Sequence, residues 1–365
     1  MGRELAEITE DRAALMFAAG CLRAVLVLAV AAWLRSLFAA ARLIPIPPVP
    51  SIRSLLTMND ISARPRLLGL ICAVGAVAMG IAYMSAAGAP SRYILMNLAA
   101  LAFGTIAWLA LGRAARSRLD GAGAVTLALA VPLLLTALFG FAFDGAARWV
   151  SFGPFNLQVS LIVLPVMLVI YARQPDEMGT VGMIVAALAV AIQPDRAMAG
   201  VLLVGLVAVL ASKRSVLPIV AAAGAILAFG WTLLMPDLLP AVPYVDRVLY
   251  TAFDVHPLAG LAVLVGAAAL ILPAAIAARR LPSERPALLA LGGCWSGVVV
   301  AAALGNYPTP LVGYGGSAVL GYLLSVALLP SGTRRSRAAP APSWSAAAGR
   351  SSDHAASELR AARLA

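Results

Sequence analysis

Apolar residues dominate the chain from about residue 66 to residue 330, in runs of about 20 residues separated by short links. A helix of that length crosses the hydrocarbon core of a bilayer. The pattern therefore predicts an all-α membrane protein, a bundle of about ten transmembrane helices. The predicted spans are 66–89, 93–112, 122–143, 157–172, 178–194, 197–211, 215–235, 257–278, 286–305 and 311–330.

Positive charge alternates along the links, which we number by the span that each one follows. Arg64 and Arg66 precede the first span. The even-numbered links carry Arg113, Arg116, Arg118, Arg173, Lys213, Arg214, Arg279, Arg280, Arg285, Arg334, Arg335 and Arg337. The odd-numbered links carry fewer cations, namely Arg92, Arg148, Arg196 and Arg247. Because Arg and Lys accumulate on the cytoplasmic side of membrane proteins, we expect both ends of the helical core in the cytoplasm and the odd-numbered links outside.

The chain divides into three parts by composition. Residues 1–60 form an N-terminal extension, in which an apolar segment interrupted by arginines precedes a proline-rich linker. That segment predicts either an extra membrane span or a helix lying at the membrane surface. Residues 61–331 are the ten-helix membrane domain, and residues 332–365 predict a basic, disordered cytoplasmic tail.

Composition narrows the chemistry further. Hydrophobic residues make up 62% of the 365 residues and charged residues 12%, which excludes a water-soluble globular protein. The net charge of +11 belongs mainly to links and tail, so it indicates membrane orientation and no nucleic-acid partner. The three cysteines and two histidines have no metal-site spacing, and we expect neither a protein-bound metal nor a cofactor.

Three motifs lie at helix junctions on the expected outer face. They are G-A-A-R-W at 145–149, Q-P-D at 193–195 and P-T-P-L-V-G-Y-G-G-S at 308–317. Each has an ordinary structural explanation when taken alone. Arg-Trp at a helix end can be an interfacial anchor, Pro-Asp a helix stop and cap, and Gly-Gly a close approach of two helices.

Together, in this order and on one face, the motifs over residues 64–330 resemble the SEDS family (shape, elongation, division and sporulation), the FtsW/RodA-type membrane proteins. The resemblance implies ten membrane helices in the bacterial inner membrane and polymerisation of lipid II in cell-wall synthesis, for division or elongation. It also implies a class B penicillin-binding protein as partner. The implied substrate-binding residues are Arg148, Trp149, Gln193, Asp195, Tyr314, Gly315, Gly316 and Ser317. A divalent cation bound with the substrate diphosphate is compatible with this chemistry.

The sequence departs from the family pattern at its acidic positions. The T-D-F-type sequence that would carry the general base at the eighth helix is missing, and link 7 is short. Asp254 is our first candidate for the base and Asp246 the second. Its neighbour Arg247 would hold Asp246 ionised or occupy it in an ion pair. A Q-P-S-E-x-A-K motif is expected at the fourth helix, but leucines, the first of them Leu161, replace its Glu and Lys.

Several interpretations therefore stay open. The protein is a glycosyltransferase with a relocated base, or a relative that binds a lipid-linked precursor or a partner without polymerising. A third interpretation is a flippase or another polyprenyl-lipid transporter, which would normally carry ionisable residues at mid-helix. Both aspartates could also serve only to solvate link 7.

Overall fold

The structure is a computed structural model that describes residues 64–114, 121–143, 146–152, 155–236 and 239–331. The N-terminal extension and the C-terminal tail lie outside the described residues, as does Gly145 of the first motif.

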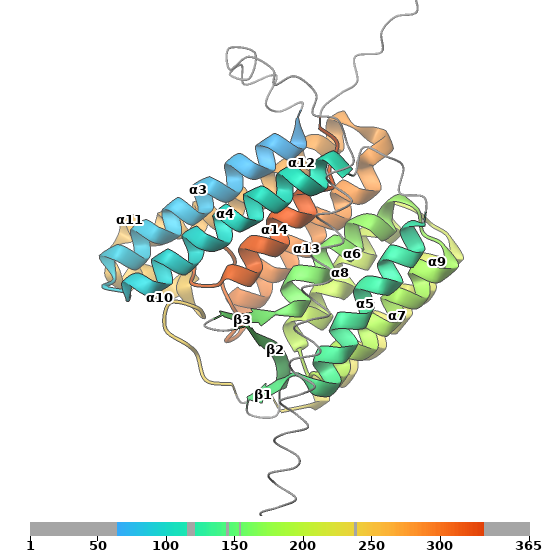
Figure 1. Cartoon of the computed structure of the whole chain (residues 1–365), viewed down its shortest axis with the longest axis horizontal. Coiled ribbons are helices and arrows are strands. Elements are labelled where there is room, and N and C mark those ends of the chain that lie inside the picture. The colour runs from blue at the N-terminus through green and yellow to red at the C-terminus, as the bar shows by residue number, and fades with distance from the viewer. Residues whose placement is uncertain (1–63, 115–120, 144–145, 153–154, 237–238, 332–365) are drawn as a thin grey trace, which may run out of the picture. The chain divides into compact units, whose positions relative to one another are not determined.

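Each of the ten predicted spans contains a helix, which confirms the helical membrane bundle (Figure 1). The helices are α3 (Pro65–Ala86), α4 (Ser91–Ala114), α5 (Ala122–Phe139), α6 (Val159–Arg173), α7 (Glu177–Ile192), α8 (Arg196–Ser212), α9 (Val216–Leu234), α11 (Pro257–Ala269) with α12 (Leu272–Arg280), α13 (Arg285–Leu304) and α14 (Gly316–Ala327). By length and composition, six spans of the described chain can cross a membrane, with α11 and α12 counted as one.

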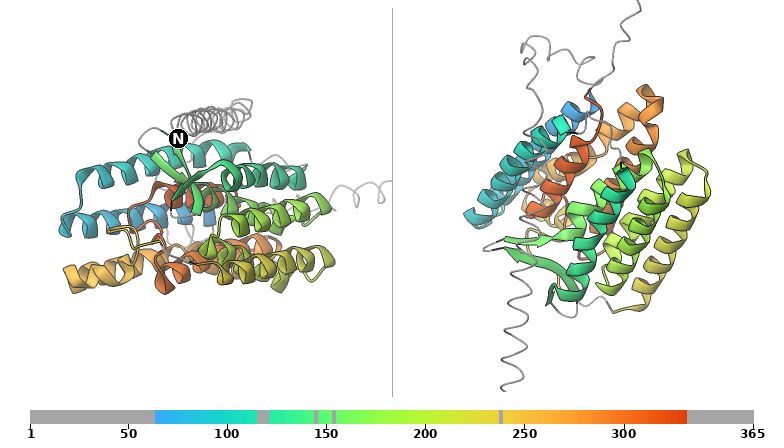
Figure 2. Two further views of the ribbon diagram at one scale, coloured as in Figure 1. Left: turned by 90° about the horizontal axis from the view of Figure 1, so that it is seen from below. Right: turned by 45° about the vertical axis from the view of Figure 1, so that its right-hand side comes forward.

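The shorter apolar helices are α6, α7, α8 and α14. Most side chains of α6 and α14 are buried. In the right-hand view of Figure 2, α14 (orange-red) lies between the blue-to-teal helices α3 and α4 and the green helices, and it packs against α3, α4 and α6. Because α6 and α14 are covered by protein, the non-helical backbone that precedes each of them can lie within the bundle without facing lipid.

The two ends of the bundle are defined by contacts between links. At one end Arg173 in link 4 pairs with Glu284 in link 8, with 3.2 Å between Nε and Oε2. Arg173 also donates to the carbonyl of Leu328, and Lys213 in link 6 donates to the carbonyl of Arg173. Links 4, 6 and 8 and the end of α14 therefore meet at one end of the bundle, which we call the even end.

The odd-numbered links meet at the opposite end, the odd end. Arg148 in link 3 donates to the carbonyl of Pro194 in link 5, and Tyr244 in link 7 donates to the carbonyl of Ala87 in link 1. Links that the arginine content groups together thus lie at the same end of the folded bundle. Which end faces the cytoplasm stays a prediction.

Link 3 forms a small sheet, an element that the predicted all-α bundle did not include. Strands β1 (Phe141–Phe143), β2 (Ala146–Phe152) and β3 (Phe155–Gln158) pair antiparallel in that order. The third predicted span is therefore too long by four residues, because α5 ends at Phe139. The sheet lies at the odd end, where the backbone groups of link 3 find partners in neighbouring strands (Figure 1).

Link 7 also contains an unexpected element, the short helix α10 (Val248–Val255). It packs against α11 and α3 at the odd end.

Close helix contacts in the centre depend on small residues. A Cβ added at Gly321 in α14 would lie 2.0 Å from the backbone oxygen of Leu161 in α6. A Cβ added at Gly80 in α3 would lie 2.5 Å from the backbone oxygen of Val312 in link 9. Such approaches of backbone to backbone are typical of packed membrane helices. They hold α14 and link 9 in fixed positions at the odd end.

The orientation in the membrane can be tested with single cysteines at two exposed positions, one at each end. Cys21, Cys72 and Cys294 are first replaced by alanine, and then Arg214→Cys or Asp254→Cys is introduced. We expect a membrane-impermeant maleimide to label Asp254→Cys in intact cells and Arg214→Cys only after lysis, because the even end carries the cationic links. Labelling in the reverse order would contradict the orientation.

Candidate functional site

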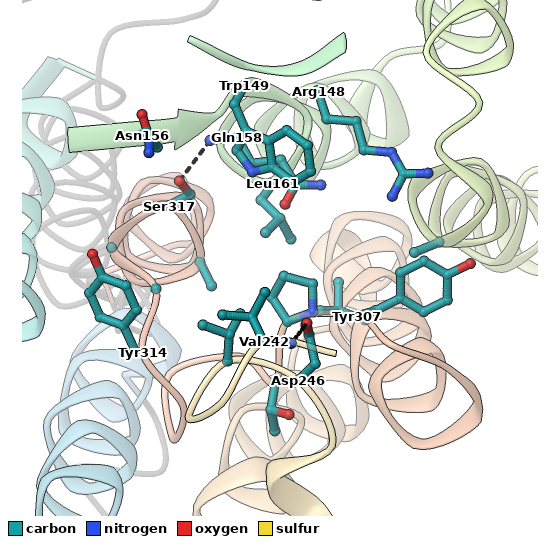
Figure 3. Close-up of a pocket in the computed structure, with 18 of the residues that line it drawn as sticks. Arg148, Trp149, Asn156, Gln158, Leu161, Val242, Asp246, Tyr307, Tyr314 and Ser317 are labelled. Carbon is teal, nitrogen blue, oxygen red and sulfur yellow. Dashed lines mark hydrogen bonds between the residues drawn. The ribbon is translucent and has the colours of Figure 1, made fainter. Parts of the chain in front are cut away.

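A cavity of about 570 Å³ opens at the odd end of the bundle (Figure 3). Its walls come from α4, β2, β3, α6, α8, α13, the start of α14, and links 7 and 9. Most of the residues that line it are apolar. Among the lining residues, Arg148 and Asp246 are the charged ones.

The structure brings most of the sequence-predicted site residues together. The predicted residues that line the cavity are Arg148, Trp149, Asp246, Tyr314, Gly315, Gly316 and Ser317. Gln193 and Asp195 are fully buried and do not line it. Asp254 lies elsewhere.

Arg148 projects from β2 at the edge of the cavity and is 4% exposed. Its Nη2 donates to the carbonyl oxygen of Pro194 at 2.5 Å. Arg196 has a different task, because its guanidinium donates to the carbonyl oxygens of Thr232 and Met235 at the end of α9. A cation at a helix C-terminus is favourable. Arg148 is thus the guanidinium that reaches the cavity.

Asp195 is buried behind the cavity wall as the N-cap of α8. Its Oδ1 accepts from the N–H of Met198 at 3.2 Å. Its Oδ2 accepts from Gln158 Nε2 at 3.1 Å and from Ser160 Oγ at 3.2 Å. A carboxylate held by three donors is satisfied in place. Asp195 therefore positions the wall at the start of α6.

Gln193 is also a supporting residue. Its Nε2 donates to the carbonyl oxygen of Leu133 in α5 at 3.1 Å. The Q-P-D motif thus joins α5, α6 and α8 behind the cavity.

Ser317 joins α14 to the sheet. Its Oγ accepts a hydrogen bond from the backbone N–H of Gln158 at 2.9 Å (Figure 3). Gln158 is the last residue of β3 and the N-cap of α6, so this bond fixes the first turn of α14 against two other walls.

Asn97 in α4 holds the glycine turn of link 9. It is fully buried, and both ends of its side-chain amide are used. Its Nδ2 donates to the carbonyl oxygen of Gly313 at 2.9 Å, and its Oδ1 accepts from the N–H of Gly315 at 3.1 Å. The sequence analysis missed Asn97, although an amide among apolar residues of a membrane helix is a signal of a specific partner.

Tyrosines stabilise the same turn from the other side. Tyr314 stacks on Tyr93, with ring centroids 4.0 Å apart and an interplanar angle of 11°. Tyr93 also packs edge-to-face with Tyr244, with ring centroids 6.0 Å apart. Tyr314 lines the cavity, so these contacts connect its rim to α4 and link 7.

Asp246 is the carboxylate of the cavity and is 8% exposed. Its Oδ2 accepts from the N–H of Val242 at 2.8 Å. Burial raises the pKa of Asp246 above its usual range, and the hydrogen bond from Val242 lowers it only in part. Arg247 is exposed, so the expectation that it holds Asp246 ionised is wrong; burial governs the pKa of Asp246.

Asp254, our first candidate for the base, is exposed in the last turn of α10 and does not line the cavity. Asp246 lines it because link 7 pairs with link 9 through a bridge between Asp246 and Pro308. Positions along the chain could not show which of the two aspartates lines the cavity, because that depends on how link 7 folds: Asp254 lies in α10, away from the cavity, and Asp246 lies before that helix. The geometry reverses the order of the candidates.

Leu161, which stands where the family pattern has Glu, also lines the cavity. The position at which the resemblance implies a Glu is therefore apolar in the cavity wall of this chain. Within the described ranges, no group of three or more His, Cys, Asp or Glu side chains is placed to hold a metal ion.

Comparisons with known proteins bear on the fold. The crystal structure of the rod shape determining protein RodA of Thermus thermophilus matches with a TM-score of 0.53 at 20% sequence identity, over 71% of this chain and 94% of that chain. A mutant of that RodA with one aspartate replaced by alanine matches with a TM-score of 0.52 at 19% identity and the same coverage. The chain has a RodA-like fold. It is a multi-pass helical membrane protein.

The RodA-like fold confirms, at the level of structure, the resemblance drawn from the three motifs. No protein-family model matches the sequence, and the search of curated proteins found no match.

The Asn97 contacts predict a measurable loss of stability. Asn97→Leu removes both hydrogen bonds and leaves the buried carbonyl of Gly313 and the partly buried N–H of Gly315 without these partners, so we expect the free energy of unfolding to fall by about 1–3 kcal/mol. Thermal unfolding in detergent measures this, with the lipid-exposed Leu98→Val in the same helix as control. Equal unfolding temperatures for the two variants would contradict the assigned role of Asn97.

Proposed function

We propose that this protein is a SEDS-type glycosyltransferase that polymerises lipid II, a disaccharide linked through a diphosphate to a polyprenyl chain. The observation that carries the proposal is an apolar cavity with one buried carboxylate and one buried guanidinium. In Figure 3, Arg148 from β2 and Asp246 from link 7 lie on different sides of that cavity.

Arg148 is suited to the diphosphate. A guanidinium binds phosphate oxygens through charge-assisted hydrogen bonds, and these are strongest where water is excluded. The first turn of α14, beginning at Gly316, also lines the cavity and presents a helix N-terminus, which favours an anion. Gly315 and Gly316 carry no side chains that would keep a ligand away from this backbone.

Asp246 is suited to act as general base. A base works best when its pKa lies near the working pH, and burial shifts the pKa of Asp246 in that direction. In the proposed step the acceptor sugar hydroxyl gives its proton to Asp246 while its oxygen bonds to the anomeric carbon of the donor. The bond between that carbon and the diphosphate breaks, and the polyprenyl diphosphate leaves with the bonding electrons.

The apolar walls are suited to the polyprenyl chain. Phe103 of α4 lines the cavity and is also 65% exposed on the surface of the bundle. The cavity therefore reaches a face that lipid would cover, and a membrane-embedded chain could lie there without crossing water.

One observation favours a second candidate, a relative that binds the lipid-linked precursor without polymerising it. Leu161 replaces a carboxylate at the cavity wall, so Asp246 has no acidic neighbour among the residues that line the described cavity. Binding needs Arg148 and the apolar walls, whereas transfer also needs the base.

The remaining expectations rest on the resemblance. We propose a class B penicillin-binding protein as the partner and the bacterial inner membrane as the location, with a role in cell division or elongation. A divalent cation would arrive with the diphosphate.

The decisive experiment gives labelled lipid II to the purified protein, with and without a class B penicillin-binding protein, and measures glycan chains. We expect Asp246→Asn to lower the rate by about 100-fold or more, as loss of a general base does. Asp254→Asn, its matched control, should polymerise at the wild-type rate because Asp254 lies outside the cavity. Arg148→Ala should weaken lipid II binding by about 10- to 100-fold, since it removes charged hydrogen bonds.

Each result has a distinct meaning. Chains that still form with Asp246→Asn would contradict the role of Asp246. Absence of chains from the wild type in every pairing, with lipid II binding that Arg148→Ala still weakens, would establish the non-catalytic relative. A wild type that binds no lipid II would overturn both candidates.

A further inference from the structure

The small sheet of link 3 presents one of its faces to the cavity. Trp149 in β2 pairs with Gln158 in β3, and Ser151 pairs with Asn156. Directly paired residues point to the same face of a sheet, and so do residues two apart along a strand. Trp149, Asn156 and Gln158 all line the cavity. This side of the sheet, which we call the sheet face, is therefore a cavity wall that carries an aromatic ring and two amide side chains.

Trp149 is the aromatic ring of the sheet face. Its side chain is partly buried, and in Figure 3 it reaches into the cavity above Leu161. Its backbone is paired on both sides, with Phe141 in β1 and with Gln158 in β3. An aromatic side chain has only two rotatable torsions, so it loses little freedom when a ligand packs on it. A tryptophan on the outer surface is placed differently, as Trp231 in the last turn of α9 is, with 52% exposure.

Asn156 adds a polar group that a neighbouring strand holds in place. The Oγ of Ser151 donates to the Oδ1 of Asn156 at 2.8 Å. This bond orients the amide and leaves Nδ2, which carries two N–H groups, to donate to a ligand. In Figure 3, Asn156 and Arg148 lie on opposite sides of Trp149. The cavity wall thus offers in turn a guanidinium, an aromatic ring and an amide.

An aromatic ring beside an amide fits a sugar. One face of a sugar ring consists largely of C–H groups, which pack on the electron-rich face of an indole, and the polar substituents at its edge bind amide N–H groups. A polyprenyl chain has no polar substituent for Asn156 to bind. A diphosphate is repelled by the negative face of the indole. Of the three parts of a lipid-linked sugar, the sheet face therefore suits the sugar best.

We propose that Trp149 and Asn156 form a subsite for the sugar joined directly to the diphosphate, with the ring stacked on Trp149 and a polar substituent bound by Asn156. This inference rests on the proposed function and names the part of the substrate that the sheet face recognises. With the diphosphate at Arg148, the first sugar is the ring that reaches the neighbouring Trp149. Asp246 lies across the cavity in Figure 3, so the free side of the stacked ring is turned toward the proposed base.

The test measures the binding of three lipids to the full-length protein. They are lipid II, a polyprenyl diphosphate that carries only the first sugar, and undecaprenyl diphosphate, which carries none. We expect Trp149→Leu to bind both sugar-bearing lipids about tenfold more weakly, the effect of a lost stacking contact, and undecaprenyl diphosphate as the wild type does. Trp149→Phe keeps an aromatic face and should bind all three lipids within about threefold of the wild type.

Two more variants separate the subsite from general effects. Asn156→Ala should bind the sugar-bearing lipids about fivefold more weakly, the effect of one lost hydrogen bond, and undecaprenyl diphosphate as the wild type does. Trp231→Leu is the matched control, because Trp231 does not line the cavity, and it should bind every lipid as the wild type does. Unchanged binding of undecaprenyl diphosphate to Trp149→Leu would also show that the sheet and Arg148 are intact in that variant.

The binding data distinguish the inference from the function on which it rests. Equal affinity of wild type and Trp149→Leu for lipid II would overturn the subsite and leave the proposed function standing. Equal weakening for all three lipids would also overturn it, because the effect would then not concern the sugar. Trp149→Phe as weak as Trp149→Leu would contradict the stacking, and weakening for lipid II alone would contradict the assignment to the first sugar. A wild type that binds none of the lipids would overturn the proposed function, and the subsite with it.

Discussion

The structure at the odd end depends on Gln158, the buried residue where β3 becomes α6. Its backbone N–H donates to Ser317 at the start of α14, and its Nε2 donates to Asp195 at the start of α8 and to Ser160. Three helices thus begin at one buried point. Polar groups at the depth of membrane helices must find partners inside the protein, and this network supplies them. The cavity lies beside this network, and Gln158 forms part of its wall.

The sequence predicted much of this arrangement because the constraints are local and repeated. The apolar runs predicted the helices, and the distribution of arginines among the links predicted which links share an end of the bundle. The sequence placed the three motifs on one face, but it could not show that Gln193 and Asp195 stand behind the cavity wall as supports. Burial and hydrogen bonds decide that difference, and both arise only in the folded bundle.

The features that the sequence analysis missed depend on pairing between distant segments. The sheet in link 3 had local signals in the sequence, with Asp144-Gly145 and Gly153-Pro154 as turn-type pairs around R-W-V-S-F, which is rich in aromatic and β-branched residues. Asp246 had no such signal. It enters the cavity because link 7 pairs with link 9, which no periodicity along the chain predicts.

The short link 7 gives the cavity its chemical character. It contributes the apolar Leu239 and Val242 together with the buried Asp246, while Asn306 of link 9 anchors it by donating to the carbonyl oxygen of Leu239 at 3.2 Å. A carboxylate in such surroundings holds its proton more strongly than one in water. The site thus combines one acid and one guanidinium within largely apolar walls.

The central claim is that this cavity holds a lipid-linked sugar between Arg148 and Asp246. A structure of the full-length protein with bound lipid II, determined by electron cryo-microscopy, tests it most directly. The account predicts the diphosphate within hydrogen-bonding distance of Arg148, the polyprenyl chain along the apolar wall at Phe103, and a sugar against Asp246. Lipid II bound outside the cavity, or inside it with the diphosphate away from Arg148, would contradict the account.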